Sequence, residues 1–336
     1  MSAQDKREVV VITGASAGVG RATARAFARR GAAVGLLARG KEGLEGVRRE
    51  VEAFGGTALA IPTDVADPSQ IEAAAVRIEN ELGPIDIWIN NAMVTVFSEF
   101  INIEPEEFRR VTEVTYLGFV YGTRTALKYM IPRNKGVIVQ VGSALAYRGI
   151  PLQSAYCGAK HGIQGFTEAV RSELMHDNLD IHLTMVQMPA LNTPQFNWSK
   201  VKMPRKPQPV PPIYQPEVAA RAIVWAAYHN RREVTVGFNN AVILWGNKFF
   251  PGIGDKYLAN TGYESQQTSV EADPDRPNNL WEPVEGDFGA HGDFDDKAKG
   301  KSWQLEVNTH WGTIGLSLLG AAVAGALWKL FENEML

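Results

Sequence analysis

Short apolar runs alternate with amphipathic stretches along the first 190 residues of the chain. The apolar runs are near-continuous, which is typical of strands that are buried on both faces of a sheet. The stretches between them carry apolar residues at helical spacing, and Gly31, Gly55 and Gly83 mark helix ends. We therefore predict strands at 9–13, 33–38, 58–61, 85–90, 137–141 and 181–186, and helices at 21–30, 41–54 and 69–82.

This alternation predicts an α/β fold, in which helices cover both faces of a doubly wound parallel sheet. After Met188 the chain becomes proline-rich and bulky, and a helix at 216–229 and a last strand at 232–236 follow. We expect one domain over residues 1–250, an irregular extension rich in Gly, Pro and Asp over residues 251–305, and an apolar helix over residues 306–336.

The segment 311–331 is strongly apolar. Residues 311–328 carry no charge, and as a helix they would be roughly 27 Å long, close to the ~30 Å of a bilayer core. Gly320 and Ala324 have the spacing of packed membrane helices, whereas four glycines dilute the hydrophobicity. The segment predicts either a membrane anchor or a helix docked on protein.

Composition narrows the function classes. The chain has 336 residues, is 45% hydrophobic and carries a net charge of −3, which excludes a strongly basic nucleic-acid binder. Its single cysteine, Cys157, excludes an intrachain disulfide, and the polar residues 1–8 contain no apolar h-region, so we do not expect a secretory signal. The six histidines show no metal-ligand spacing. We expect a protein of the cytoplasm, or of the cytoplasmic face of a membrane, without a metal site.

A glycine-rich turn follows the first strand. The sequence from Thr13 to Gly20 is TGASAGVG, and a helix begins there. Gly14, Gly18 and Gly20 allow a tight turn and a close approach of the backbone to a pyrophosphate, which the N-terminus of the helix would bind. Glycines also form ordinary turns, but the strand–turn–helix context is the one that a dinucleotide site requires.

The end of the second strand bears on the choice of dinucleotide. NAD-binding proteins usually place an acid there for the ribose 2′-hydroxyl, whereas this chain has Ala38 and Arg39. A guanidinium is suited to a 2′-phosphate, so the sequence favours NADP(H) over NAD(H). The alternative is a solvated arginine at a strand end.

Tyr156 and Lys160 are four residues apart and would share one face of a helix. An ammonium beside a phenol stabilises the phenolate and lowers a pKa that is ordinarily about 10, which would let Tyr156 exchange a proton with a carbonyl or alcohol oxygen. Ser143 follows the fifth strand and could polarise the same oxygen. A Tyr–Lys pair alone is usually a surface feature, but this pair follows a dinucleotide turn.

The turn at 13–20, the sequence Asn90-Asn91-Ala92, the set Ser143, Tyr156 and Lys160, and Pro189 with Thr193 together resemble the short-chain dehydrogenase/reductase family over roughly residues 7–240. The resemblance implies a Rossmann-type fold with about seven strands, and hydride transfer between a nicotinamide cofactor and a carbonyl or alcohol carbon. It also implies the cofactor contacts: Ser16, Ala17 and Val19 at the phosphates, Arg39 at the 2′-phosphate, Asp64 and Val65 at the adenine, Asn91 and Ala92 at the ribose, Tyr156 and Lys160 at the nicotinamide ribose, and Pro189 and Thr193 at the nicotinamide amide and phosphates.

Three positions depart from the family pattern. Met93 and Ala190 replace glycines, and Thr115 replaces an asparagine that anchors a water in the proton relay. A threonine hydroxyl can also hold a water, so Thr115 is included among the candidate catalytic residues. The departures leave an alternative to a carbonyl reductase or alcohol dehydrogenase: a catalytically weak NADP-binding sensor or scaffold.

The sequence also supports general expectations about the substrate class and the oligomeric state. Residues 191–214 are expected to cover the pocket and carry Phe196, Trp198 and Met203, which favours a bulky, largely apolar carbonyl or alcohol substrate. The resemblance implies a homo-oligomer that pairs through the helix at 155–176.

Overall fold

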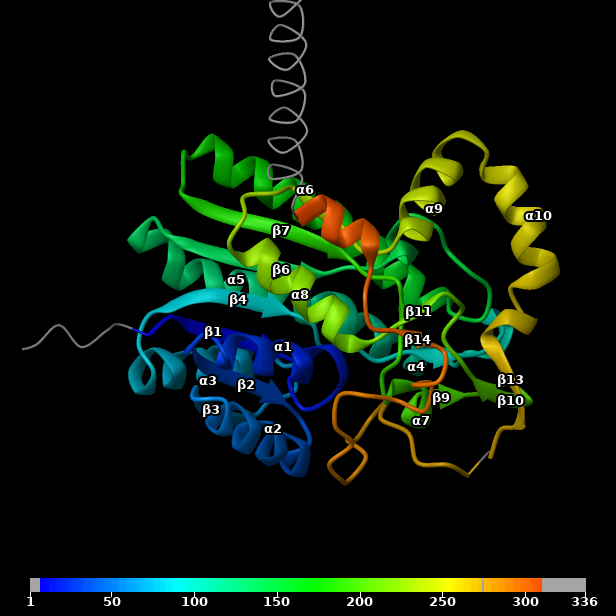
Figure 1. The fold of residues 1–336 in the computed structure, drawn as a ribbon, viewed down its shortest axis with the longest axis horizontal. Coiled ribbons are helices and arrows are strands. Elements are labelled where there is room, and N and C mark those ends of the chain that lie inside the picture. Colours follow the sequence, from blue (N-terminus) through cyan, green and yellow to red (C-terminus); the bar gives the residue numbers. More distant parts are fainter. Residues whose placement is uncertain (1–6, 274, 310–336) are drawn as a thin grey trace, which may run out of the picture.

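The computed structural model describes residues 7–273 and 275–309. Its centre is a seven-stranded sheet in the order β12-β7-β6-β4-β1-β2-β3, in which every neighbouring pair is parallel (Figure 1). The predicted α/β fold with a doubly wound parallel sheet is thereby confirmed. The strands are β1 (Val9–Thr13), β2 (Ala33–Ala38), β3 (Thr57–Pro62), β4 (Ile85–Asn90), β6 (Gly136–Val141), β7 (Ile181–Gln187) and β12 (Glu233–Thr235).

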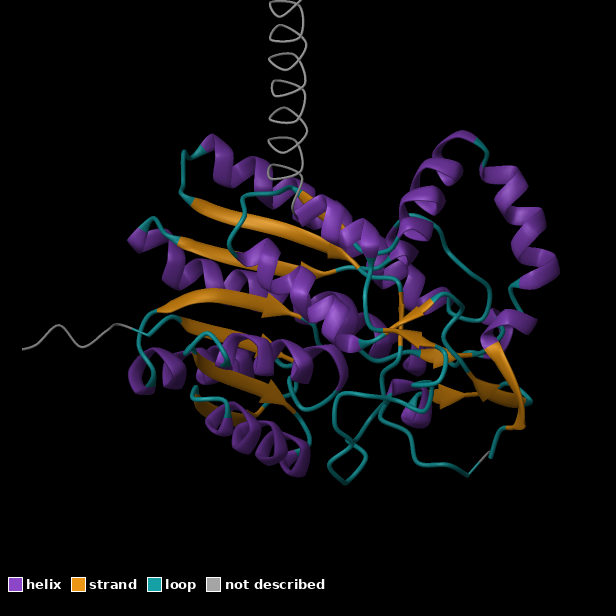
Figure 2. Ribbon diagram, viewed as in Figure 1, coloured by secondary structure: helices purple, strands orange, loops and turns teal. Residues whose placement is uncertain are grey.

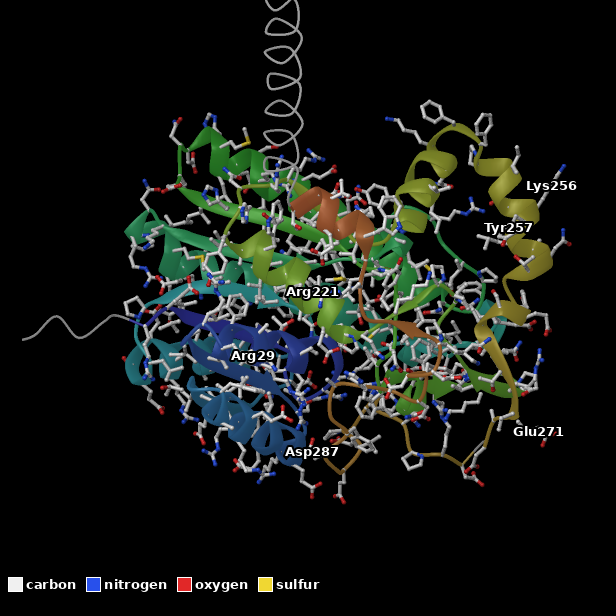
Figure 3. All side chains as sticks on the ribbon, in the orientation of Figure 1. Arg29, Arg221, Lys256, Tyr257, Glu271 and Asp287 are labelled. Atoms are coloured by element: carbon white, nitrogen blue, oxygen red, sulfur yellow. The ribbon has the colours of Figure 1, made fainter. Side chains whose placement is uncertain are left out.

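Helices cover both faces of the sheet (Figure 2). One face carries α1 (Gly18–Ala28), α2 (Lys41–Ala53) and α8 (Pro216–Ala227); the other carries α3 (Pro68–Glu81), α4 (Pro105–Thr112), α5 (Gly118–Met130) and α6 (Ser154–His176). Arg29 of α1 and Arg221 of α8 are exposed on the outer side (Figure 3).

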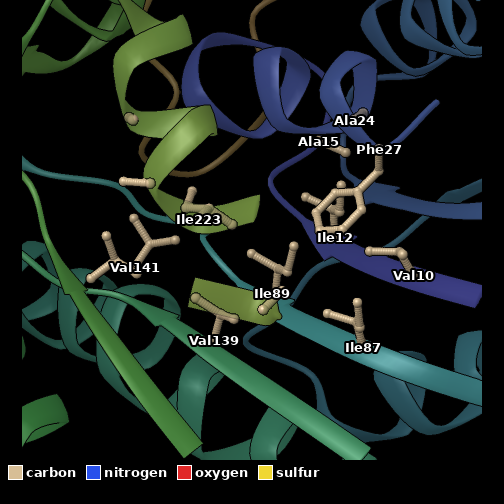
Figure 4. Close-up of a cluster of buried hydrophobic side chains, with 14 of the residues drawn as sticks. Val10, Ile12, Ala15, Ala24, Phe27, Ile87, Ile89, Val139, Val141 and Ile223 are labelled. Atoms are coloured by element: carbon tan, nitrogen blue, oxygen red, sulfur yellow. The ribbon is translucent and has the colours of Figure 1, made fainter. Parts of the chain in front are cut away.

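Alternate residues of each strand serve the two faces. Val10 and Ile12 of β1 pack with Phe27 of α1 and Ile223 of α8 (Figure 4), whereas Val9 and Val11 belong to the cluster on the opposite face. This burial on both sides explains why the strands are apolar runs rather than alternating ones.

The chain beyond β12 is more regular than we predicted. Helices α9 (Phe238–Phe249) and α10 (Pro251–Thr261) form a helical hairpin that stands beside the sheet (Figures 1 and 2). Further on, β13 (Gln267–Glu271) pairs antiparallel with β10 (Arg205–Pro207), and β14 (Ala298–Lys299) pairs with β11 (Ile213–Tyr214). The expectation that residues 251–305 are irregular throughout is therefore corrected.

Residues 279–305 return to the body of the protein and are anchored there. Leu280 is 0% exposed in the cluster of the α3 face, and Leu305 is 2% exposed in the cluster of the α1 face. Among the described helices, none has the length and apolar character needed to cross a membrane. The predicted apolar segment 311–331 lies outside the described residues.

Candidate active site

The carboxyl ends of the parallel strands border a large cavity of about 1000 Å³. A ligand of such a sheet binds at this edge, near the point where the strand order reverses. Of the predicted site residues, all except Gly20 and Thr115 line the cavity: Gly14, Ser16, Ala17, Gly18, Val19, Arg39, Asp64, Val65, Asn91, Ala92, Ser143, Tyr156, Lys160, Pro189 and Thr193. The structure therefore brings together side chains that are far apart in the sequence.

The turn between β1 and α1 has the shape of a phosphate cradle. Gly14 and Gly18 have φ angles of +66° and +55°, which favour glycine, and a Cβ atom on Gly20 would lie 2.2 Å from the carbonyl oxygen of Gly14. The side-chain amide of Asn91 donates to the carbonyl oxygens of Thr13 and Gly14, at 3.0 and 3.2 Å, and so fixes the turn. These residues fit a dinucleotide pyrophosphate at the N-terminus of α1.

Next to this turn, Arg39 faces the part of the cavity expected for the adenosine ribose. Its guanidinium donates to the carbonyl oxygens of Trp281 at 2.7 Å and Asn279 at 2.5 Å. Asp64, by contrast, accepts a 2.5 Å hydrogen bond from Arg110, a residue that no sequence motif indicated. Among the described residues, no carboxylate forms an ion pair with Arg39, so its charge remains available to an anion.

The candidate catalytic side chains come from β6 and α6. Ser143 follows β6, Tyr156 lies in the first turn of α6, and Lys160 lies one turn later. The Lys160 ammonium donates to the carbonyl oxygen of Val141 at 2.7 Å and lies 5.5 Å from the centre of the Tyr156 ring. The hydroxyl of Ser143 hydrogen-bonds to Tyr156, so the three predicted groups meet at one wall of the cavity.

Burial dominates the acid–base properties of this set. It raises the pKa of the Tyr156 phenol above its ordinary value, although the hydrogen bond from Ser143 opposes the shift. Burial also lowers the pKa of Lys160 to about 7. We expected the ammonium to lower the pKa of the phenol; in the protein alone, desolvation raises the pKa of the phenol instead. The phenol is consequently held in its protonated form at neutral pH.

Thr115 lies behind the cavity wall rather than on it. Its side chain is fully buried in a π-helical turn at Glu113–Leu117. The hydroxyl donates to the carbonyl oxygen of Val94 at 2.8 Å and accepts from the Val94 amide at 3.0 Å. Its only hydrogen is therefore used by the backbone, and the residue is placed to position the loop after β4, next to Met93.

The opposite part of the cavity is largely apolar. Met93 and Phe97 line it from the sheet side, and Phe250, Ile253 and Tyr257 line it from the α9–α10 hairpin. The hairpin contribution was missed from the sequence, because Gly252 and Gly254 interrupt the apolar pattern of α10. Of the bulky residues predicted to cover the pocket, Phe196 and Trp198 line the cavity. Met203 is buried beside Phe196 in a separate cluster.

Comparison with known proteins identifies the family. The family model described as short chain dehydrogenase matches residues 8–202, so the chain belongs to the short-chain dehydrogenase/reductase family and is an oxidoreductase of that family. Membership implies a nicotinamide cofactor. A crystal structure of a short-chain dehydrogenase from Streptomyces avermitilis shares the fold, with a TM-score of 0.63 and 24% identity over 79% of this chain and 100% of that chain.

Curated relatives extend the similarity beyond the matched domain. The uncharacterized oxidoreductase YxnA of Bacillus subtilis is 30% identical over 96% of this chain and 89% of its own. The 3-dehydrosphinganine reductase of Danio rerio is 32% identical over 64% of this chain and 67% of its own. The ketoacyl reductase HetN of Nostoc is 32% identical over 69% of this chain and 79% of its own.

Proposed function

We propose that the protein is an NADP(H)-dependent carbonyl reductase, reversible in principle, in which Tyr156 is the proton donor. The observation that carries the proposal is the common wall: Ser143, Tyr156 and Lys160 border the same cavity as the glycine turn at 13–20. The glycine turn would hold the phosphates of a dinucleotide, and Tyr156 and Lys160 would border its nicotinamide end. Fold and site together support this class of reaction.

Side chains of the protein would hydrogen-bond and protonate the substrate oxygen. The bound nicotinamide cofactor supplies the hydride for the carbonyl carbon in reduction and accepts it in oxidation. As the carbonyl carbon gains the hydride, the oxygen takes the electron pair of the C=O bond and then the proton of the Tyr156 hydroxyl. The Ser143 hydroxyl donates to the same oxygen, and the Lys160 ammonium stabilises the phenolate that remains. A phenol kept protonated by burial is suited to this direction.

The preference for NADP(H) rests on Arg39. Its guanidinium lines the cavity, and both of its recorded hydrogen bonds go to neutral carbonyl oxygens. Each bond uses one N–H, which leaves other donors of the fork for a 2′-phosphate. NAD(H) would offer no phosphate to these donors.

The apolar end of the cavity supports a bulky apolar carbonyl compound. Phe97, Phe250 and Tyr257 contribute aromatic surface there. Two relatives are named as reductases, one of 3-dehydrosphinganine and one of a ketoacyl compound, which supports reduction as the direction and a lipid-like keto compound as the substrate class. Assembly into a homo-oligomer, and association with the cytoplasmic face of a membrane through residues 311–331, remain proposals that the sequence alone supports.

A panel of ketones with NADPH, followed by its absorbance, tests the proposal. Long-chain and polycyclic ketones should be reduced, and Tyr156→Phe should lose most of the activity, by about 10²-fold or more, while binding NADPH with unchanged fluorescence enhancement. Equal turnover by Tyr156→Phe would refute the proton donor. Tight NADPH binding without turnover of any carbonyl compound would favour the alternative, a sensor or scaffold.

A further inference from the structure

A segment outside the matched family domain forms part of the cavity wall. The family match ends at residue 202, yet Asn279, Pro283, Gly286 and Phe288 line the cavity next to the glycine turn and Arg39. The ring of Phe288 packs edge-on against Trp198, with 4.7 Å between ring centres. Residues 279–289, here called the cofactor strap, therefore border the region where the adenosine half of a dinucleotide would lie.

The cofactor strap is hydrogen-bonded both to Arg39 and to the phosphate turn. At one end, the carbonyl oxygens of residues 279 and 281 accept from the guanidinium of Arg39. At the other, the carbonyl oxygen of Gly289 accepts from the amide of Gly18 in the phosphate turn at 3.1 Å. Between them, Asp287, which is labelled in Figure 3, forms an ion pair with Arg21, whose side chain is only 4% exposed.

The carbonyls that meet Arg39 are fixed from behind. The side chain of Leu280 is 0% exposed in the core, and its own carbonyl oxygen accepts from Nε of Arg110 at 3.1 Å. The amide of Asn279 donates to the carbonyl oxygen of Trp198 at 2.8 Å. Alternate carbonyls of this short stretch therefore point to two different arginines, and Leu280 locks the alternation in place.

Fixing the Arg39 guanidinium has an energetic consequence. An arginine side chain loses rotamer entropy when a ligand orders it, and prior ordering removes part of that cost. Arg110 and Asp64 form an ion pair nearby, and Glu282 acts on Arg39 only through its charge, so the Arg39 guanidinium keeps donors for an anion. A phosphate on the 2′-oxygen of an adenosine ribose is the ligand group that matches a preorganised fork.

We infer that residues 279–281 of the strap determine the preference for a 2′-phosphorylated dinucleotide by holding Arg39 in its binding orientation. The inference rests on the proposed NADP(H) dependence and adds that the specificity depends on a segment beyond the family domain. Leu280 is then a positioning residue, which acts through Arg39 without touching the cofactor.

Two buried leucines of the same extension provide a matched test. Leu280→Ala should loosen the carbonyls that hold Arg39, whereas Leu305→Ala leaves a comparable cavity in the other core cluster. Calorimetry would measure the affinity of the full chain for adenosine 2′,5′-bisphosphate and for 5′-AMP. We expect Leu280→Ala to lower the affinity for the bisphosphate by about 10-fold and the affinity for 5′-AMP by less than about 2-fold. Leu305→Ala should leave the ratio of the two affinities unchanged.

The outcomes separate the inference from the proposed function. A wild-type protein that binds both adenosine ligands equally would refute the NADP(H) preference and the inference together. A wild-type preference that survives in Leu280→Ala would overturn the inference alone. If circular dichroism shows that Leu280→Ala is unfolded, Leu280→Val decides by the same ratio. Arg39→Ala should abolish the preference, and adding Leu280→Ala to it should change the ratio no further.

Discussion

The ammonium of Lys160 donates to the carbonyl oxygen of Val141 at 2.7 Å, while the lysine side chain is 2% exposed. A neutral carbonyl does not compensate fully for the lost hydration of a cation, and burial accordingly lowers the lysine pKa to about 7. The bond ties the first turns of α6 to the end of β6, which is how the fold fixes a charged group beside Tyr156. The protein thus contains, at its candidate catalytic centre, a desolvated amine that titrates near neutral pH.

Replacing Lys160 by methionine should change how stability depends on pH. The folded protein holds Lys160 with a pKa of about 7, whereas the unfolded chain has the ordinary value near 10.5. Between these values the unfolded state binds more protons, so Lys160 makes the free energy of unfolding of the wild type rise with pH, and the stability cost is largest below pH 7. Lys160→Met should lack this rise.

Urea unfolding between pH 6.5 and 8.5, without added cofactor, measures the difference. We expect the free energy of unfolding of Lys160→Met to exceed that of the wild type most at pH 6.5, and progressively less toward pH 8.5. Both proteins contain Cys157, whose thiol pKa is raised by burial, so its titration cancels in the difference. A constant difference across the range would show that Lys160 titrates in the folded protein as it does in water.

The glycine turn offers a second prediction with a built-in control. A Cβ atom on Gly20 would lie 2.2 Å from the carbonyl oxygen of Gly14, so Gly20→Ala must displace the phosphate turn. We expect it to weaken NADPH binding by at least about 10-fold. Gly165 of α6 is exposed and has nothing within 4 Å of an added Cβ, so Gly165→Ala should stabilise the protein by about 0.4–1 kcal/mol and leave binding unchanged. Fluorescence titration and urea unfolding measure both effects.

The sheet could be predicted closely because its strands are buried on both faces. Residues 9–13, 33–38 and 85–90 are strands with the predicted bounds, since a continuous apolar run between turn signals leaves few alternatives. Helix α10 could not be predicted in this way, because its apolar side chains face a cavity rather than a packed core.

The candidate site was predictable where its chemistry is local. Tyr156 and Lys160 lie one helical turn apart, so their spacing alone placed them on one face. The partners of Arg39 at Asn279 and Trp281 follow from tertiary folding over more than two hundred residues, and no local pattern signals them. Likewise, the direction in which the pKa of Tyr156 shifts depends on burial, and the spacing of residues in the sequence does not reveal burial.

Thr115 provides the third prediction, because its two bonds to Val94 indicate a positioning role. Thr115→Val keeps the shape of the side chain and leaves the buried amide and carbonyl of Val94 without that partner. We expect a loss of about 1–3 kcal/mol in the free energy of unfolding, measured with urea, and a kcat per folded molecule within about 2-fold of the wild type. Thr115→Ser should restore most of the stability. A large fall in kcat at unchanged stability would instead support the water-anchoring role.

Arg148 provides the last prediction, which concerns the apolar side of the cavity. Its guanidinium donates to the side chains of Asn247 at 3.0 Å and Asp255 at 2.7 Å, and so joins the α9–α10 hairpin to the loop that follows Ser143. Arg148→Ala should free the hairpin, which then presents Phe250 and Ile253 to a substrate less well. We expect faster amide hydrogen exchange over residues 247–255 and a higher KM for bulky ketones, at a kcat close to that of the wild type. Arg232→Ala, which removes an exposed pair with Glu168, is the control and should change neither. Unaltered exchange in Arg148→Ala would show that packing alone holds the hairpin in place.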